Sequence, residues 1–118
     1  MFRSMLPRLG LICALGALLA APAAFAADDT ITYELVVKDH AFQPDKLVVP
    51  TGERIKLIIK NEDVTPMEFE SYDLGREKVI VGKFTATLYL GPLEAGSYKF
   101  FDDFHRAATG TIIAKPKK

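Results

Sequence analysis

Two short segments of this chain carry residue types that bind metal ions. In the first, Glu68 and Glu70 are two positions apart within 67–71, a run that alternates between apolar and acidic residues. Side chains two apart in a β-strand point to the same face, and two adjacent negative charges repel each other unless a cation lies near them. The pair therefore indicates either a solvated strand face or carboxylate ligands for a metal ion.

The second segment follows an aromatic run near the C-terminus. Asp102, Asp103 and His105 occur within four residues, directly after a predicted strand at 97–101. A carboxylate and an imidazole together suit iron, copper, zinc or manganese. The alternative interpretation is a hydrogen-bonded Asp–His pair on the surface.

The elements that must position these residues are predicted to be β-strands. Residues 31–38 alternate with period two, which places Ile31, Tyr33, Leu35 and Val37 on one face. Further strands are expected at 46–50, 54–61, 67–71, 77–81, 85–90, 97–101 and 111–115. Gly and Pro residues separate these runs, and no segment keeps a helical period for three turns. The pattern predicts an all-β fold, an antiparallel β-sandwich of about eight strands, with its chemistry on loops at one end.

One further candidate depends on how the strands meet. A hairpin around Gly52 that joins 46–50 to 54–61 would bring His40 close to the loop after the second strand. His40 is therefore a candidate site residue. The alternative is a surface turn histidine next to Asp39.

Glu77 is another acidic candidate, on the strand that follows 67–71. If the two strands are neighbours, Glu77 lies beside Glu70. Arg76 and Lys78 flank Glu77 in the sequence, so a plain ion pair is the alternative interpretation.

The N-terminus has the features of a cleaved export signal. Residues 1–8 contain two arginines, 9–21 are apolar, and 24–26 form a small-x-small cleavage site, Ala-Phe-Ala. The apolar run is shorter than the roughly 20 residues of a membrane span. We therefore expect a signal peptide at 1–26, a mature domain at 27–118 and a location in the periplasm.

Composition excludes several classes of protein. A chain of 118 residues is too short for a multidomain enzyme. Its 15 Lys+Arg and 15 Asp+Glu form no long basic stripe, so no nucleic-acid partner is expected. The single cysteine, Cys13, lies within the predicted signal, so the mature domain has neither a thiol nor a disulfide.

Taken together, these segments resemble the cupredoxin family over nearly the whole mature chain. The similar motifs are Phe42-x-Pro44, Leu47-x-Val49-Pro50-x-Gly52, Ile55-x-Leu57, Asn61-x-Asp63 and Gly96-Ser97-Tyr98-x-Phe100. The resemblance implies a cupredoxin-like Greek-key sandwich. Laid on blue copper proteins, Asp102 stands at the thiolate position, His105 keeps the second histidine position, and Met67 takes the place of the first histidine. A type 1 site needs a thiolate, so blue-copper electron transfer is excluded.

The chain is more closely similar to thiol-free, cupredoxin-like periplasmic proteins associated with bacterial ferrous iron uptake. The similar motifs are Thr65-Pro66-x-Glu68-Phe69-Glu70-Ser71, Arg76-Glu77-Lys78-Val79, Gly91-Pro92-Leu93 and Phe100-Phe101-Asp102-Asp103-Phe104-His105. The resemblance implies a copper or iron ion held by Glu68, Glu70, Glu77 and the 102–105 turn. It also implies an inner-membrane iron permease and other periplasmic iron-uptake components as partners. Met67 stands where relatives commonly carry Glu or His. Its thioether favours Cu(I), whereas the carboxylates favour iron or Cu(II).

Three hypotheses about function remain open at this point. The first is a periplasmic metal-binding protein that carries copper or iron for ferrous iron uptake. The second is a metal-free β-sandwich that docks on an exported or membrane partner. The third is a ferrous oxidase, with which the motifs are compatible.

Overall fold

The computed structural model describes residues 30–117, which form nine β-strands. The strands are β1 (Ile31–Lys38), β2 (Ala41–Gln43), β3 (Lys46–Pro50), β4 (Ile55–Asn61), β5 (Met67–Ser71), β6 (Arg76–Ile80), β7 (Thr85–Leu90), β8 (Gly96–Asp102) and β9 (His105–Lys115). The signal peptide predicted at 1–26 lies outside the described residues. Within 30–117, no helix is long and apolar enough to cross a membrane.

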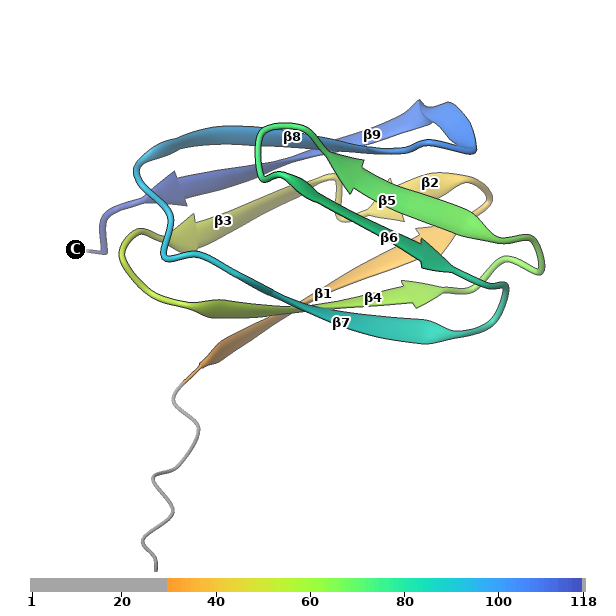
Figure 1. Cartoon of the computed structure of the whole chain (residues 1–118), viewed down its shortest axis with the longest axis horizontal. Helices are drawn as coiled ribbons and strands as arrows, with labels where there is room; N and C mark the ends of the chain where they lie inside the picture. The colour runs from red at the N-terminus through yellow and green to blue at the C-terminus, as the bar shows by residue number, and fades with distance from the viewer. Residues whose placement is uncertain (1–29, 118) are drawn as a thin grey trace, which may run out of the picture.

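The strands form two sheets packed face to face, with orders β2-β1-β4-β7 and β3-β9-β8-β5-β6 (Figure 1). This confirms the predicted all-β sandwich. Two pairings, β1 with β4 and β3 with β9, are parallel, so the expectation of a wholly antiparallel arrangement was wrong. Between the two strands of each parallel pair, the chain crosses to the other sheet and returns. The two strands then lie side by side and run in the same direction. β2 was not predicted, because three residues are too few for a period to be detected.

The hairpin expected around Gly52 does not form. β3 pairs with β9, whereas β4 pairs with β1 and β7 in the other sheet. Two backbone hydrogen bonds hold the connection between β3 and β4. Thr51 N donates to the Lys115 carbonyl at 3.2 Å, and Gly52 N donates to the Leu93 carbonyl at 3.0 Å. The turn therefore carries the chain from one sheet to the other.

The apolar faces of the two sheets form the core. Its largest fully buried side chains include Leu35 and Ile59 from one sheet and Phe69, Phe100 and Ile112 from the other. The Phe69 and Phe100 rings lie 5.2 Å apart. Burying each such side chain contributes about 1.5–3 kcal/mol to the free energy of folding. The core therefore fixes the two sheets against each other, and with them the polar residues at the ends of the strands.

Four connections gather at one end of the sandwich: β1–β2, β4–β5, β6–β7 and β8–β9 (Figure 1, right). The buried Asn61 ties two of them together. Its amide donates to the Thr65 carbonyl at 2.9 Å and to the Ile80 carbonyl at 3.0 Å. Gly82 completes the contact, because a Cβ there would lie 2.1 Å from the Val64 carbonyl oxygen. These contacts fix the β4–β5 and β6–β7 connections against each other at this end of the molecule.

Candidate metal-binding site

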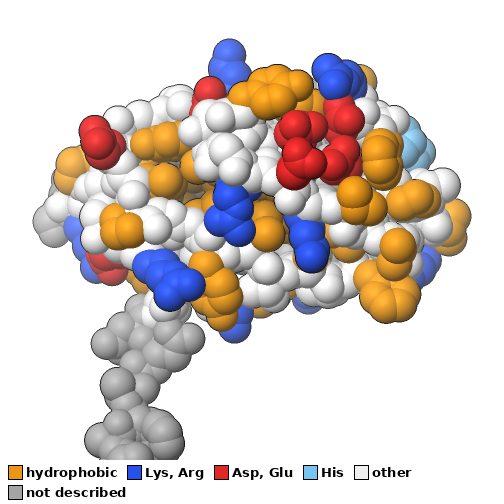
Figure 2. Space-filling model, viewed as in Figure 1, with side chains coloured by type: hydrophobic (Ala, Val, Ile, Leu, Met, Phe, Trp, Pro, Cys, Tyr) orange, Lys and Arg blue, Asp and Glu red, His pale blue; other side chains and the backbone are white. Residues whose placement is uncertain are grey.

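An acidic cluster forms on the outer face of the five-stranded sheet. Glu68 and Glu70 of β5 and Asp103 of the β8–β9 turn each place one carboxylate oxygen within 4.8 Å of the other two. Asp103 N donates to the Glu68 carbonyl at 2.8 Å, which fixes the turn against β5. The three half-buried side chains belong to the red patch in Figure 2. The structure thus brings together three of the residues that the sequence predicted for the site.

Glu77 adds a fourth negative charge to this patch. It is the direct cross-strand partner of Glu70, on β6. The pKa of Glu68 is raised above its ordinary value by burial and then by the charges of Glu77, Asp103 and Glu70. Ionisation of Glu68 therefore costs more free energy in the folded chain than in a free glutamate, and a bound cation would relieve this repulsion.

The alternative ion pair for Glu77 is not formed. The Arg76 guanidinium instead donates to the Tyr89 carbonyl at 2.6 Å. Among residues 30–117, neither Arg76 nor Lys78 forms an ion pair with Glu77. In the described part of the chain, Glu77 therefore has no ion-pair partner that would compete with a bound metal ion.

Arg106 is the cation that borders the cluster, and the sequence analysis did not identify it. Its guanidinium forms an ion pair with Asp103 and lies 5.2 Å from the centre of the Phe101 ring. The hydrogen bond and charge of Asp103 raise the pKa of Arg106. The i,i+3 spacing of Asp103 and Arg106 in the sequence is the feature that could have indicated this ion pair. Arg106 leaves the cluster with excess negative charge, because four carboxylates face one guanidinium.

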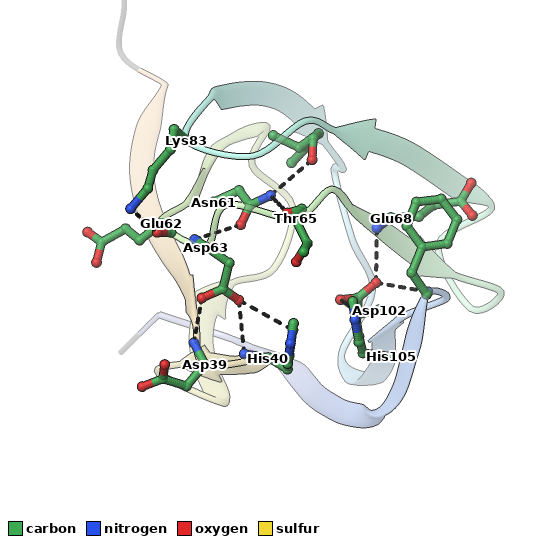
Figure 3. Close-up of polar contacts among 12 residues, drawn as sticks. Asp39, His40, Asn61, Glu62, Asp63, Thr65, Glu68, Lys83, Asp102 and His105 are labelled. Carbon is green, nitrogen blue, oxygen red and sulfur yellow. Dashed lines mark hydrogen bonds and ion pairs between the residues drawn. The ribbon is translucent and has the colours of Figure 1, made fainter.

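Asp102 does not join the cluster, although it is adjacent to Asp103 in the chain. Its side chain is fully buried. One carboxylate oxygen accepts hydrogen bonds from Glu68 N and Phe104 N, both at 3.0 Å, and the other lies 3.1 Å from His105 Nδ1 (Figure 3). Asp102 is the last residue of β8 and ties β5 to the turn, whereas Asp103 belongs to the turn itself and lies on the outer face.

Met67 also lies apart from the cluster. Its side chain is buried on the core face of β5, opposite the face that carries Glu68 and Glu70. The reason is again the alternation of the strand. Its thioether is thus part of the hydrophobic core.

His40 occupies the tight turn between β1 and β2. Asp39 and His40 have φ values of 54° and 56°, as a two-residue hairpin turn of type I′ requires. Asp63 stabilises this turn, because its carboxylate accepts the Asp39 N–H at 2.7 Å and the His40 N–H at 2.9 Å. His40 thus lies on an exposed turn next to Asp39, which is the position that the alternative interpretation described. Its Nδ1 lies 3.5 Å from the Asp63 carboxylate.

The two histidines meet at this end of the sandwich. The rings of His40 and His105 stack with their centroids 3.8 Å apart and their planes 17° from parallel. In Figure 3, His40 lies between the Asp63 carboxylate and His105. His40 reaches this position through β1 and its pairing with β4, and not through the hairpin that the sequence suggested.

Asp63→Ala is expected to lower the free energy of unfolding by about 2–3 kcal/mol. Two charge-assisted hydrogen bonds to a turn in the left-handed region are lost. Burial alone would raise the pKa of Asp63, but the amides of His40 and Asp39 and the charges of His40 and Lys83 lower it overall. Stability from ionised Asp63 is therefore present above the unfolded value of 3.8 and is lost as the pH falls through the lowered pKa.

Urea unfolding between pH 7 and pH 2.5 measures this effect. The difference between wild type and Asp63→Ala should shrink as the pH falls below about 4. Glu62→Ala is the matched control, because the adjacent Glu62 makes its hydrogen bonds within 30–117 through its backbone, from its N–H to the Val37 carbonyl and from Lys83 Nζ to its own carbonyl. A difference that stays constant down to pH 2.5 would contradict the assigned role of the carboxylate.

Sequence comparison identifies relatives of the chain. A family model described as a cupredoxin-like domain matches residues 10–114. The uncharacterized protein RP394 of Rickettsia prowazekii (strain Madrid E) is 42% identical over 87 residues, which are 73% of this chain and 70% of that protein.

Solved structures share the fold at low identity. The metal-binding domain of the Cu(I)-exporting P-type ATPase CopA of Streptococcus pneumoniae D39 is 12% identical, covers 75% of this chain and 90% of its own, and has a TM-score of 0.66. Auracyanin A, a "blue" copper protein of Chloroflexus aurantiacus, is 14% identical, covers 72% and 98%, and has a TM-score of 0.63. At these identities the likeness concerns the fold alone.

Proposed function

We propose that this chain, which belongs to the cupredoxin-like domain family, is a periplasmic metal-binding protein that carries copper or iron and serves ferrous iron uptake. The observation that carries the proposal is the grouping of Glu68, Glu70 and Asp103, whose carboxylate oxygens lie within 4.8 Å of one another. Glu77 adds charge to the same patch. Such a grouping costs electrostatic energy in the free protein, and a bound cation offsets that cost.

The donor set favours iron in this cluster. Carboxylate oxygens are hard ligands that suit Fe ions and, less selectively, Cu(II). The only cysteine of the chain, Cys13, lies outside the described residues, and the Met67 thioether is buried in the core. Among residues 30–117, no soft ligand therefore accompanies the cluster. The structural similarity to a domain of a Cu(I)-exporting ATPase and to a blue copper protein supports a metal ion as the ligand of this chain.

Calorimetric titration of the metal-free protein tests this function. Fe(II) under anaerobic conditions and Cu(II) in a non-chelating buffer should each bind with saturable heat and a whole-number stoichiometry. Absence of heat, together with no metal retained after desalting, would contradict the proposal. That result would favour a metal-free interaction module.

Iron binding by the cluster should weaken in mild acid. Neighbouring charges raise the pKa of Glu68 above its ordinary value of 4.5, so protons compete with the metal ion at a higher pH than for an isolated carboxylate. In anaerobic Fe(II) titrations, the midpoint of the loss of affinity should lie above pH 4.5. Glu77→Gln removes one of these charges and should move the midpoint to lower pH. If Glu77→Gln leaves the midpoint pH unchanged, the charge of Glu77 is not a cause of the acid sensitivity.

Exposed apolar side chains support docking on a membrane partner as a second candidate function. Val64, Val81 and Phe84 are 79%, 51% and 65% exposed, and they lie on the β4–β5 and β6–β7 connections. These two connections are joined by a hydrogen bond from Lys83 N to the Asp63 carbonyl at 3.0 Å. An inner-membrane iron permease is the partner that this role implies. Capture of the permease by metal-free wild type, and its loss in Val64→Ser/Phe84→Ser, would support this function.

A further inference from the structure

A groove of about 450 Å3 lies on the outer face of the five-stranded sheet, over β8 and β9. This volume falls in the range of about 300–1,000 Å3 that is typical of small-molecule sites. The groove borders the acidic cluster, because Phe101 on its wall is the cross-strand partner of Glu70. Within residues 30–117, however, no Asp or Glu lines it. The groove is therefore a separate place on this face, with a different chemistry.

One wall of the groove is aromatic. The Tyr72 and Phe101 rings meet edge to face with their centroids 5.3 Å apart, and Tyr72 is 70% exposed. A ligand ring that covers these side chains removes apolar surface from water and adds aromatic contact. This wall therefore favours a ligand with a flat, apolar body.

A row of polar side chains crosses the sheet next to the aromatic wall. The strand register places Lys99 of β8 and Lys46 of β3 on either side of Thr111 of β9. Both lysines are exposed, and within the described residues neither forms an ion pair. The nearby Asp73 carboxylate accepts the backbone N–H of Lys99 at 2.8 Å. The two ammonium groups and the hydroxyl are thus available to an anionic group of a ligand.

Arg106 belongs both to the groove and to the border of the acidic cluster. Its guanidinium pairs with Asp103 and lies 5.2 Å from the centre of the Phe101 ring. It therefore offsets the negative charge of the cluster on the side where that charge would repel an anion. Figure 2 shows hydrophobic and basic side chains directly beside the acidic patch.

We infer that this groove binds a small aromatic carboxylate. The ring of the ligand packs against Tyr72 and Phe101. Its carboxylate accepts hydrogen bonds from the Lys99 ammonium and the Thr111 hydroxyl, and Lys46 adds positive charge from β3. An inorganic anion would leave the aromatic wall exposed, and a neutral ring would leave the ammonium groups without a partner. The two parts of the groove together therefore favour a ligand that has both features.

Nuclear magnetic resonance of isotope-labelled, metal-free protein tests this site, with benzoate as the probe. Millimolar benzoate should cause saturable shifts of the backbone amides at 97–101 and 109–111. Benzamide has the same shape without the charge, and it should bind at least about tenfold more weakly, because a charge-assisted hydrogen bond is lost. Absence of saturable shifts in these two segments, or equal binding of benzamide, would overturn the inference.

Two variants at exposed positions test the two parts of the groove separately. Lys99→Gln should weaken benzoate binding about tenfold through the lost charge. Tyr72→Ala should weaken it about three- to tenfold through the lost aromatic contact. Lys56→Gln is the matched control, because Lys56 lies on β4 in the other sheet, and it should leave the affinity unchanged.

Benzoate affinity that neither Lys99→Gln nor Tyr72→Ala lowers would also overturn the inference. The melting temperature of each variant verifies that it folds. The test is independent of the proposed function, because it uses metal-free protein and no residue of the acidic cluster is changed.

Discussion

Glu68→Gln/Glu70→Gln is expected to weaken Fe(II) binding at least about 100-fold and to raise the melting temperature of the metal-free protein. Both carboxylates lie within 4.8 Å of Asp103, so the variant removes two of the three grouped ligands. Loss of one outer-shell partner already costs about 10- to 100-fold, and direct ligands contribute at least as much. The metal-free protein gains stability because ionised Glu68, whose pKa is raised in the folded state, no longer opposes folding.

Thermal unfolding with and without Fe(II) measures both effects in one experiment. A metal at about 100 times its Kd stabilises the folded chain by about 2.7 kcal/mol, which is a rise in melting temperature of roughly 10 °C or more for a domain of this size. Wild type should show this rise, and the double variant should lose it.

Glu34→Gln is the matched control for the double variant. Glu34 is an exposed carboxylate on β1, in the other sheet, where it pairs with Lys60. Its substitution should leave the metal-dependent rise intact. A double variant that keeps the full rise would exclude the acidic cluster as the binding site.

Asp102→Ala is expected to destabilise the protein by about 3–5 kcal/mol, the largest effect on folding that we anticipate. Its fully buried carboxylate is the shared acceptor for Glu68 N, Phe104 N and His105 Nδ1. Removing one partner from a buried polar network leaves the others without hydrogen bonds. Since small domains are stable by only about 5–15 kcal/mol, urea unfolding should show a large loss.

Asp102→Asn separates the role of the carboxylate in folding from its effect on His105. The amide oxygen can still accept from Glu68 N and Phe104 N, so this variant should recover part of the lost stability. Its NH2 group would donate to His105 Nδ1 and place the ring proton on Nε2. The nitrogen chemical shifts of the His105 ring, measured by NMR, should then report the proton on Nε2. Equal stability of Asp102→Ala and wild type would contradict the structural role of Asp102.

Local features of the sequence predicted the parts of the fold that depend on near neighbours. Alternation placed Leu35 and Val37 on a buried face and Glu68 and Glu70 together on one strand face, and both expectations agree with the structure. The strand period is a local property of the backbone, so a single segment reveals it. Metal binding by these residues stays a prediction.

Long-range pairing decided the rest. The sequence could not predict the parallel pairing of β1 with β4, because neighbours in a sheet are set by how the whole chain packs. The contact of Asp63 with the His40 turn spans 23 residues of sequence, and β4 must first pair with β1 to create it. Arg106 likewise became part of the site only when the β8–β9 turn placed it against Asp103.

By itself, the sequence determined an all-β chain with carboxylates and imidazoles near the ends of strands. Only the tertiary structure decided which of these groups act together. Asp102 and Asp103 are chemically equivalent in the sequence, yet one is buried as a hydrogen-bond acceptor and the other faces the acidic cluster. The physical reason is that β8 ends at Asp102, so the turn places Asp103 against β5, and the packing of the two sheets decides which of the two side chains is buried.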